Sequence, residues 1–248
     1  MNAQVQTSFN VLVIGDSCID EYHYGVVDKI SPEAPVPIFK FKYKELKDGM
    51  AANVKENLLK LECSVTSILS NPSKKIRLID DRSKQHIVRI DQDLISLPFI
   101  YDSLDLNQYD SIVISDYDKG FISYELIECL RKDFNGPIFV DTKKRNLSRF
   151  NGCFVKINEL EYSLATSFCD DIILTLGSAG ASYKGIAYPA CHVEVSDVCG
   201  AGDTFLASLT YRYLQTKSIS DAIRFAIIAS SITIQHVGVY APSIDEIL

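Results

Sequence analysis

A short glycine-rich loop before a helical segment carries the residues of this sequence that are best suited to chemistry. The loop is Gly200-Ala201-Gly202-Asp203, and an apolar helical pattern follows it over residues 204–213. Free backbone N–H groups at a helix start, together with the helix dipole, favour a bound anion. A carboxylate in the first turn can take a proton from a hydroxyl beside that anion. The loop therefore predicts phosphoryl transfer, with Asp203 as the base and the neighbouring N–H groups as the anion hole.

The same loop also has a plainer interpretation, as a helix N-terminus that is capped by a carboxylate. Other nucleotide and metal motifs do not compete with it. The sequence has no GxxxxGK[ST], no GxGxxG after its first apolar run, and no HExxH spacing among its four histidines. The choice between a cap and a catalytic loop therefore depends on the rest of the chain.

The elements that must position this loop alternate between strand and helix patterns. Short apolar runs predict strands that are buried on both faces, at Val11–Ile14, Ile112–Ile114, Ile138–Val140, Phe154–Ile157 and Asp171–Thr175. Helical patterns lie between and after them, at Ala51–Leu61, Tyr124–Phe134, Gly202–Leu214 and Ile219–Gln235. This alternation predicts an α/β fold with a mostly parallel central sheet.

The segment from Glu21 to Lys47 departs from that alternation of strands and helices. It contains three prolines, and apolar or aromatic residues alternate with lysines over 38–43. A second strand pair, Lys75–Ile79 and Gln85–Ile90, flanks the turn at 80–83. Exposed strands of this kind need a cover, so they predict either a lid over a ligand or a dimerisation surface. We expect a single domain over residues 1–248 with a lid formed by about 21–47 and 75–91.

Composition limits the partners and the compartment. The chain has 248 residues, of which 47% are hydrophobic and 23% charged, and its formal net charge is -7. An acidic balance of this kind predicts no broad attraction to nucleic acid or to an anionic membrane. The seven cysteines form no CxxC pair, which predicts reduced thiols that fill the core. Met1–Asn10 has no signal-peptide pattern, and no apolar run has membrane length, so we expect a cytoplasmic protein.

Five motifs, in the same order along the chain, resemble those of the ribokinase-like (PfkB-type) carbohydrate kinases. They are Gly15–Asp20, Gly49–Asn53, Asn158–Glu161, Thr175–Gly180 and Asp197–Phe205. The resemblance implies a three-layer α/β/α fold with a small β lid. It also implies a kinase that transfers the γ-phosphoryl group of ATP to a sugar hydroxyl and uses Mg²⁺.

The resemblance assigns roles to individual residues. Asp203 becomes the general base, and the N–H groups of Gly200, Ala201 and Gly202 neutralise the transferring phosphoryl group. Asn158 and Glu161 resemble the NxxE motif that helps to hold Mg²⁺, with Glu161 as the metal ligand. The ATP loop comprises Thr175, Gly177 and Gly180, and the sugar site comprises Asp16, Asp20, Gly49 and Asn53.

These residues also have structural interpretations that need no ligand. Asp16 or Asp20 can cap a loop at a strand end, and Gly177 can serve a turn. Asn158 can be a helix N-cap whose capping box is completed by Glu161. The order of the five motifs favours the functional interpretation.

Within this family, four stretches resemble the kinases that phosphorylate heptose 7-phosphate: Gly15–Tyr22, Ile30–Pro37, Gln85–Asp91 and Ser115–Gly120. This likeness implies transfer to the anomeric hydroxyl of a heptose 7-phosphate-like sugar and a homodimer formed through the lid. It adds Arg89 and Asp116 to the predicted acceptor site.

Three departures from the family pattern matter, of which the first two bear on the substrates and the third on the periphery of the sheet. Met50 stands where a second glycine is usual, Ile227 stands near the predicted adenine site in place of an Asn, and the chain is short at 70–75 and 161–171. Two other functions therefore stay open. One is a non-catalytic protein that binds a sugar phosphate or a nucleotide, and the other is a kinase of another small carbohydrate or nucleoside.

Overall fold

The main body of the molecule is built on one eight-stranded sheet. The computed structural model describes residues 8–101 and 104–248. Most of Met1–Asn10, where the sequence shows no signal-peptide pattern, therefore lies outside the described residues. The strand order is β12-β11-β10-β9-β8-β7-β1-β4. The strands are β1 (Asn10–Gly15), β4 (Ser64–Leu69), β7 (Ser111–Asp116), β8 (Ile138–Thr142), β9 (Phe154–Asn158), β10 (Ile172–Thr175), β11 (Ala181–Tyr183) and β12 (Ile186–Tyr188). In this spatial order, neighbouring strands between β10 and β4 pair in parallel. Strand β11 pairs antiparallel with both β10 and β12.

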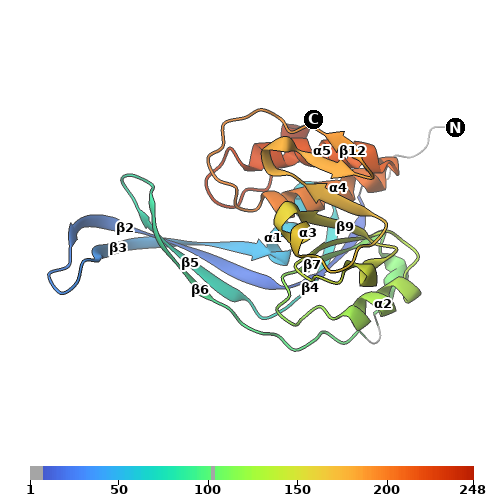
Figure 1. Cartoon of the computed structure of the whole chain (residues 1–248), viewed down its shortest axis with the longest axis horizontal. Helices are drawn as coiled ribbons and strands as arrows, with labels where there is room; N and C mark the ends of the chain where they lie inside the picture. Colours follow the sequence, from blue (N-terminus) through green and yellow to red (C-terminus); the bar gives the residue numbers. More distant parts are fainter. Residues whose placement is uncertain (1–7, 102–103) are drawn as a thin grey trace.

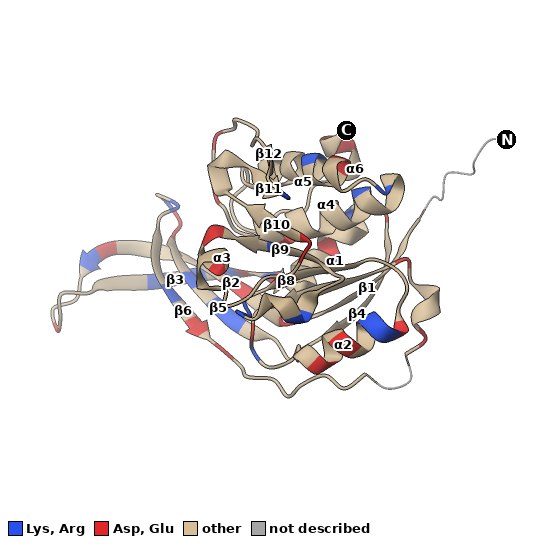
Figure 2. Ribbon diagram, turned by 45° about the vertical axis from the view of Figure 1, so that its right-hand side comes forward, with Lys and Arg blue, Asp and Glu red and all other residues tan. Residues whose placement is uncertain are grey.

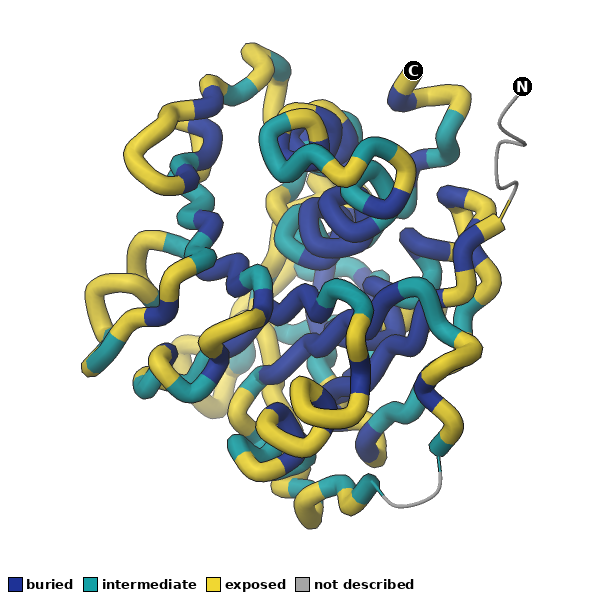
Figure 3. The backbone as a smooth tube through the Cα atoms, turned by 90° about the vertical axis from the view of Figure 1, so that its right-hand side faces the viewer, coloured by how far each residue is buried: buried dark blue, intermediate teal, exposed yellow. Residues whose placement is uncertain are grey.

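Helices cover both faces of this sheet, as alternation along β1 requires. Val11 and Val13 face the core shared with α1 (Ala51–Lys60), α4 (Ala201–Thr216) and α5 (Ile219–Thr233). Leu12 and Ile14 face the core shared with α2 (Tyr124–Asp133). Figure 3 shows the buried strands between these helices. The shorter helices are α3 (Glu159–Leu164) and α6 (Ile244–Ile247), with 3-10 turns at Leu106–Gln108, Leu147–Phe150 and Gly177–Ala179. The predicted three-layer α/β/α fold with a mostly parallel sheet is confirmed.

A second sheet of four strands reaches away from this body (Figure 1). Its order is β3-β2-β5-β6, with β2 (Ser17–Ile30), β3 (Pro37–Met50), β5 (Ser73–Asp80) and β6 (His86–Gln92). Only Asp16 separates β1 from β2, and β3 runs directly into α1. The base of the second sheet is therefore fixed to the carboxyl end of β1 and to the start of α1.

Some features of the fold differ from the expectations. The edge strand β4 was not predicted, because its Ser and Thr residues break the apolar pattern. The expectation that the cysteines fill the core is wrong for Cys129 and Cys191, which are exposed. In the described part of the chain, no helix is both long enough and apolar enough to span a bilayer.

Candidate active site

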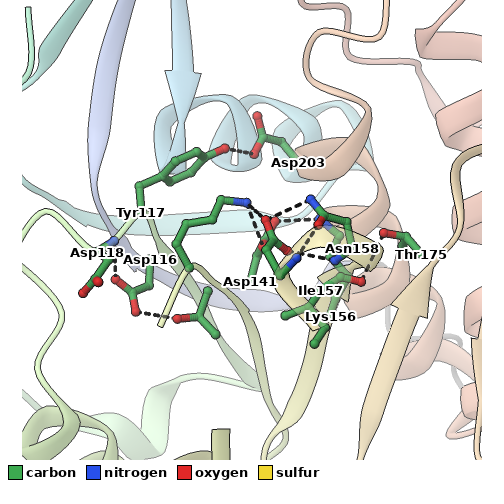
Figure 4. Close-up of polar contacts among 12 residues, drawn as sticks. Asp116, Tyr117, Asp118, Asp141, Lys156, Ile157, Asn158, Thr175 and Asp203 are labelled. Carbon is green, nitrogen blue, oxygen red and sulfur yellow. Dashed lines mark hydrogen bonds and ion pairs between the residues drawn. The ribbon is translucent and has the colours of Figure 1, made fainter. Parts of the chain in front are cut away.

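Asp203 lies buried in the first turn of α4. Gly200, the N-cap residue, has a φ of 78°, and a Cβ there would lie 2.9 Å from Asn53 Nδ2, so both conformation and space favour glycine. One Asp203 oxygen accepts a hydrogen bond from Asn53 Nδ2 at 2.9 Å. The other accepts from the Tyr117 hydroxyl at 3.4 Å (Figure 4). Burial raises the pKa of Asp203 to about 6, against the opposing effect of the Asn53 hydrogen bond. This is the range expected of a general base at neutral pH.

Asn57 fixes the orientation of the Asn53 amide. Its Nδ2 donates to Asn53 Oδ1 at 3.2 Å and to the Asn53 carbonyl at 2.8 Å, one turn along α1. Since Asn53 Oδ1 is already an acceptor, its NH₂ group points to Asp203. Asn53, predicted for the sugar site, thus holds the predicted base in place. Asn57 was missed, although its i, i+4 spacing from Asn53 was visible in the sequence.

Tyr117 joins the acceptor side of the site to the base. Its backbone N–H donates to Asp16 Oδ2 at 2.7 Å, and burial raises the pKa of its hydroxyl well above the usual range. Asp16 is fully buried, and its second oxygen has no hydrogen-bond partner among the described residues. Asp116 accepts from Thr142 Oγ1 at 2.7 Å and from Asp118 N at 2.9 Å, so it braces the turn that carries Tyr117. Tyr117 was missed, although it lies within the heptose-kinase-like stretch 115–120.

Asp20 and Gly49 meet at the base of the second sheet. Asp20 forms a buried ion pair with Arg77 of β5. A Cβ at Gly49 would lie 2.4 Å from Asp20 Oδ2 and 2.5 Å from Cys18 Sγ, so only glycine leaves room for these side chains. Arg89, in contrast, pairs with Asp91 on its own strand at 2.9 Å. The charge of Arg89 is therefore already neutralised by Asp91, and Arg89 lies on an exposed strand.

Met50 has the backbone geometry of a glycine. It is the N-cap of α1, with φ 57° and ψ −132°, and its side chain is buried. A non-glycine residue in this region costs of the order of 1–3 kcal/mol. The second glycine of the family pattern would adopt this backbone conformation without strain. Met50 instead places a side chain at a position where glycine has none.

A cavity of about 1090 Å³ opens on the other side of the α4 start. Predicted ATP-site residues Asn158, Thr175, Gly177 and Gly180 all line it, together with Ala201, Gly202 and Ile227. A Cβ at Gly180 would lie 2.0 Å from the Tyr188 carbonyl oxygen, which explains that glycine. Apolar walls with a helix start at one end suit a nucleotide whose phosphates point to α4.

Lys156 brings a positive charge to the same helix start. Its Nζ donates to Asp141 Oδ2 at 2.7 Å, and both side chains are buried (Figure 4). A Cβ at Gly202 would lie only 2.9 Å from this Nζ, so the ammonium lies close to the backbone at the start of α4. Lys156 was missed, although a lysine inside the apolar run 154–157 is the kind of buried charge that needs a reason.

The predicted metal residues form the capping box that was the alternative interpretation. Asn158 N and Nδ2 donate to Glu161 at 2.8 and 2.9 Å, and Lys143 also pairs with Glu161. The described residues contain no group of three His, Cys, Asp or Glu side chains that could hold a metal. Asp141 Oδ1 is buried without a hydrogen-bond partner, 3.9 Å from Lys143 Nζ. The carboxylates of Asp141 and Glu161 are of the type that binds Mg²⁺. This ion usually keeps waters and substrate phosphates as its other ligands.

Proteins of similar sequence or structure include carbohydrate kinases. Residues 153–246 match the pfkB family carbohydrate kinase profile. The bifunctional protein HldE of Nitratiruptor sp. is 30% identical over 298 residues, which cover 96% of this chain and 64% of that protein. Ribokinase from Thermotoga maritima superposes with a TM-score of 0.71 at 16% identity, covering 96% of this chain and 98% of that one. Phosphofructokinase-2 from Escherichia coli gives 0.72 at 15%, covering 98% and 97%.

These similarities confirm the predicted resemblance to PfkB-type carbohydrate kinases and the ribokinase-like fold. The chain spans less than two thirds of the HldE relative. The matched length of 298 residues exceeds the 248 of this chain, so the relative carries segments that are missing here. In the structure only residues 70–72 connect β4 to β5, and α3 has six residues, which are the two places where a loss was predicted.

Proposed function

We propose that this relative of the pfkB family carbohydrate kinases transfers the γ-phosphoryl group of ATP to the anomeric hydroxyl of heptose 7-phosphate or a related sugar phosphate. The observation that carries the proposal is the position of Asp203. It is a buried carboxylate with a pKa of about 6, and it lies between the nucleotide-sized cavity and the acceptor-side residues Asp16 and Tyr117. The likeness to HldE and the heptose-kinase-like stretches support the choice of acceptor.

The residues around Asp203 divide the work of transfer. Asp203 takes the proton of the attacking hydroxyl, and the free Asp16 oxygen accepts a hydrogen bond from a second hydroxyl. The N–H groups of Gly200 and Gly202 form no hydrogen bond within the described residues, whereas Ala201 N–H donates to the Val198 carbonyl at 3.3 Å. Gly200 and Gly202 therefore offer the free donors for the transferring phosphoryl group, and the Lys156 ammonium lies against them.

We further propose that Asp141 and Glu161 hold Mg²⁺ through its waters. When bound, the ion neutralises charge on the ATP phosphates. The protein's own part is to present the unpartnered Asp141 oxygen and to hold Glu161 through Asn158.

A coupled ADP assay over a panel of sugars and sugar phosphates tests the function. We expect acceptor-dependent ADP formation, highest with a heptose 7-phosphate or a similar sugar phosphate. The controls are reactions without acceptor and without protein. ADP formation that no acceptor stimulates would remove the kinase proposal.

A non-catalytic binding protein is the second candidate, and Met50 and Ile227 motivate it. It predicts that ATP or a sugar phosphate raises the melting temperature while no acceptor stimulates ADP formation. The same panel, read by thermal unfolding, separates the two candidates.

We propose that the second sheet is the lid of a single kinase domain in the cytoplasm, and that its outer face pairs with a second copy of the chain. Strand register places Leu46, Ile76, Leu78, Val88 and Ile90 on the face opposite Asp20 and Tyr22. Leu46, Val88 and Ile90 are each more than two fifths exposed. The same face carries the ion-paired side chains of Glu21, Lys44 and Lys74, so the apolar residues form a patch bordered by charges. An exposed apolar patch needs a cover, and a second lid is a matching surface.

Replacing Val88 and Ile90 together by Glu should convert a dimer into a monomer, because two charges cannot be buried unpaired at an apolar interface. Sedimentation velocity measures the change. Val237, which is exposed outside the lid, provides the control substitution Val237→Glu. A wild type that sediments as a monomer at micromolar concentration contradicts the lid dimer.

A further inference from the structure

Lys143 occupies the space between the two carboxylates that we propose to hold Mg²⁺. It pairs with Glu161 Oε1, and its Nζ lies 3.9 Å from Asp141 Oδ1. That Asp141 oxygen is buried and has no hydrogen-bond partner among the described residues. The same ammonium lies 5.2 Å from the centroid of the Tyr117 ring. The protein therefore places a positive charge of its own where the proposed function needs a divalent ion.

The two carboxylates are held in position by groups other than Lys143. Glu161 closes the capping box of α3, where it accepts hydrogen bonds from Asn158 N and Nδ2. Figure 2 shows the acidic residues of α3, which follows β9 directly. Asp141 lies near the end of β8, and its other oxygen accepts from Lys156 at 2.7 Å. A metal ion would therefore find both carboxylates already in place.

The side chain of Lys143 is the part of this group that can move. It is 34% exposed, whereas the side chains of Asp141 and Glu161 are 5% and 11% exposed. A lysine carries its charge on a flexible four-carbon stem and can place it in several positions. The face of the Tyr117 ring attracts an ammonium group and lies within reach. Since the Tyr117 hydroxyl contacts Asp203, a displaced ammonium would stay beside the base.

We propose that Lys143 and Mg²⁺ exclude each other at Asp141 and Glu161, so that the protein takes the ion together with the nucleotide and not before it. This inference rests on the proposed kinase function. Two cations held by the same pair of largely buried carboxylates repel each other, because little water screens them there. Without nucleotide, Lys143 neutralises the carboxylates and keeps the ion out. The ATP phosphates reverse this balance, because they bring the ion and offer the ammonium a new anionic partner.

Titration of Mn²⁺ into the nucleotide-free protein, followed by calorimetry, tests the exclusion. Mn²⁺ is a suitable probe because it takes the same oxygen ligands as Mg²⁺. Lys143→Met should bind Mn²⁺ roughly tenfold or more tightly than the wild type, since the carboxylates lose their competing ammonium. Lys143→Arg keeps the charge and should bind Mn²⁺ as weakly as the wild type. Lys184→Met, which removes a lysine from an exposed ion pair with Asp171, should also match the wild type.

A second substitution locates the added affinity. Lys143→Met combined with Glu161→Gln should lose it, because one of the two carboxylates is gone while Gln can still close the capping box. Circular dichroism shows whether each variant is folded. Binding of Mn²⁺ to folded Lys143→Met that is no tighter than to the wild type, or tighter binding that survives Glu161→Gln, overturns the inference.

The titration contains neither ATP nor an acceptor, so its outcome is separate from that of the ADP assay. A failed exclusion leaves the kinase function standing. Conversely, a lack of acceptor-stimulated ADP formation removes the kinase function, and the competition between Lys143 and the ion is still measured.

Discussion

Replacing Asp203 by Asn is expected to lower kcat/KM for phosphoryl transfer by roughly 10² to 10⁴-fold, the usual contribution of a general base. The fold should persist. An Asn oxygen still accepts from Asn53 Nδ2, and its NH₂ group can donate to the Tyr117 hydroxyl oxygen. Because burial raises the pKa of Asp203, the charged form is disfavoured in the folded state, and a neutral Asn should keep or raise the melting temperature.

The next helix supplies a matched control for this substitution. Asp221 occupies the same position in the first turn of α5 as Asp203 in α4, but it is exposed and pairs with Arg224 at 3.4 Å. Asp221→Asn should leave turnover unchanged, which would separate catalysis from a general effect of removing a helix-start charge. Wild-type turnover in Asp203→Asn would contradict the mechanism.

The pH profile provides a second check on the same residue. Since kcat/KM follows the free enzyme, it should be flat near neutral pH and fall about tenfold per pH unit below the Asp203 pKa of about 6, where the base becomes protonated. A sugar phosphate titrates in a similar range. Asp203→Asn therefore serves as the reference, and its residual rate should lack the part of the inflection that belongs to Asp203.

Replacing Lys156 by Met is expected to destabilise the protein by about 3 kcal/mol or more, since it leaves the buried Asp141 carboxylate without its closest partner. Lys143, 3.9 Å from the other Asp141 oxygen, only partly compensates. Unfolding by urea measures the loss. The double variant Lys156→Met with Asp141→Asn should recover most of it, because no unpaired charge remains.

The recovered double variant then tests the role of Lys156 at the helix start. The comparison is with Asp141→Asn alone, because both variants lack the proposed Mg²⁺ ligand Asp141 and differ only at Lys156. With the ammonium gone from Gly202, the KM for ATP should be higher in the double variant than in Asp141→Asn. Lys184→Met is the control, since its pair with Asp171 is solvent-exposed and should contribute little to stability. A single Lys156→Met variant as stable as wild type would show that the buried pair is unimportant.

Local patterns were enough to predict much of this molecule. Apolar runs and helical periods identified the strands β1, β7, β8, β9 and β10 and the long helices α1, α2, α4 and α5. The glycines at 177, 180, 200 and 202, which the sequence singled out, lie at a cavity or at a helix start, because backbone conformation and close approach are local demands. The capping box of Asn158 and Glu161 was predicted as an alternative for the same reason.

The sequence by itself thus determined the alternating fold and the glycine-rich helix start with its carboxylate, since both depend on spacing along the chain. Tertiary structure alone decided which side chains surround that carboxylate. Asn53 and Asp203 are 150 residues apart, and Tyr117 reaches Asp203 across 86. Asn53 meets Asp203 because α1 and α4 pack together on one face of the sheet, and Tyr117 joins them because β7 ends beside them. This order is set by packing and not by adjacency in sequence.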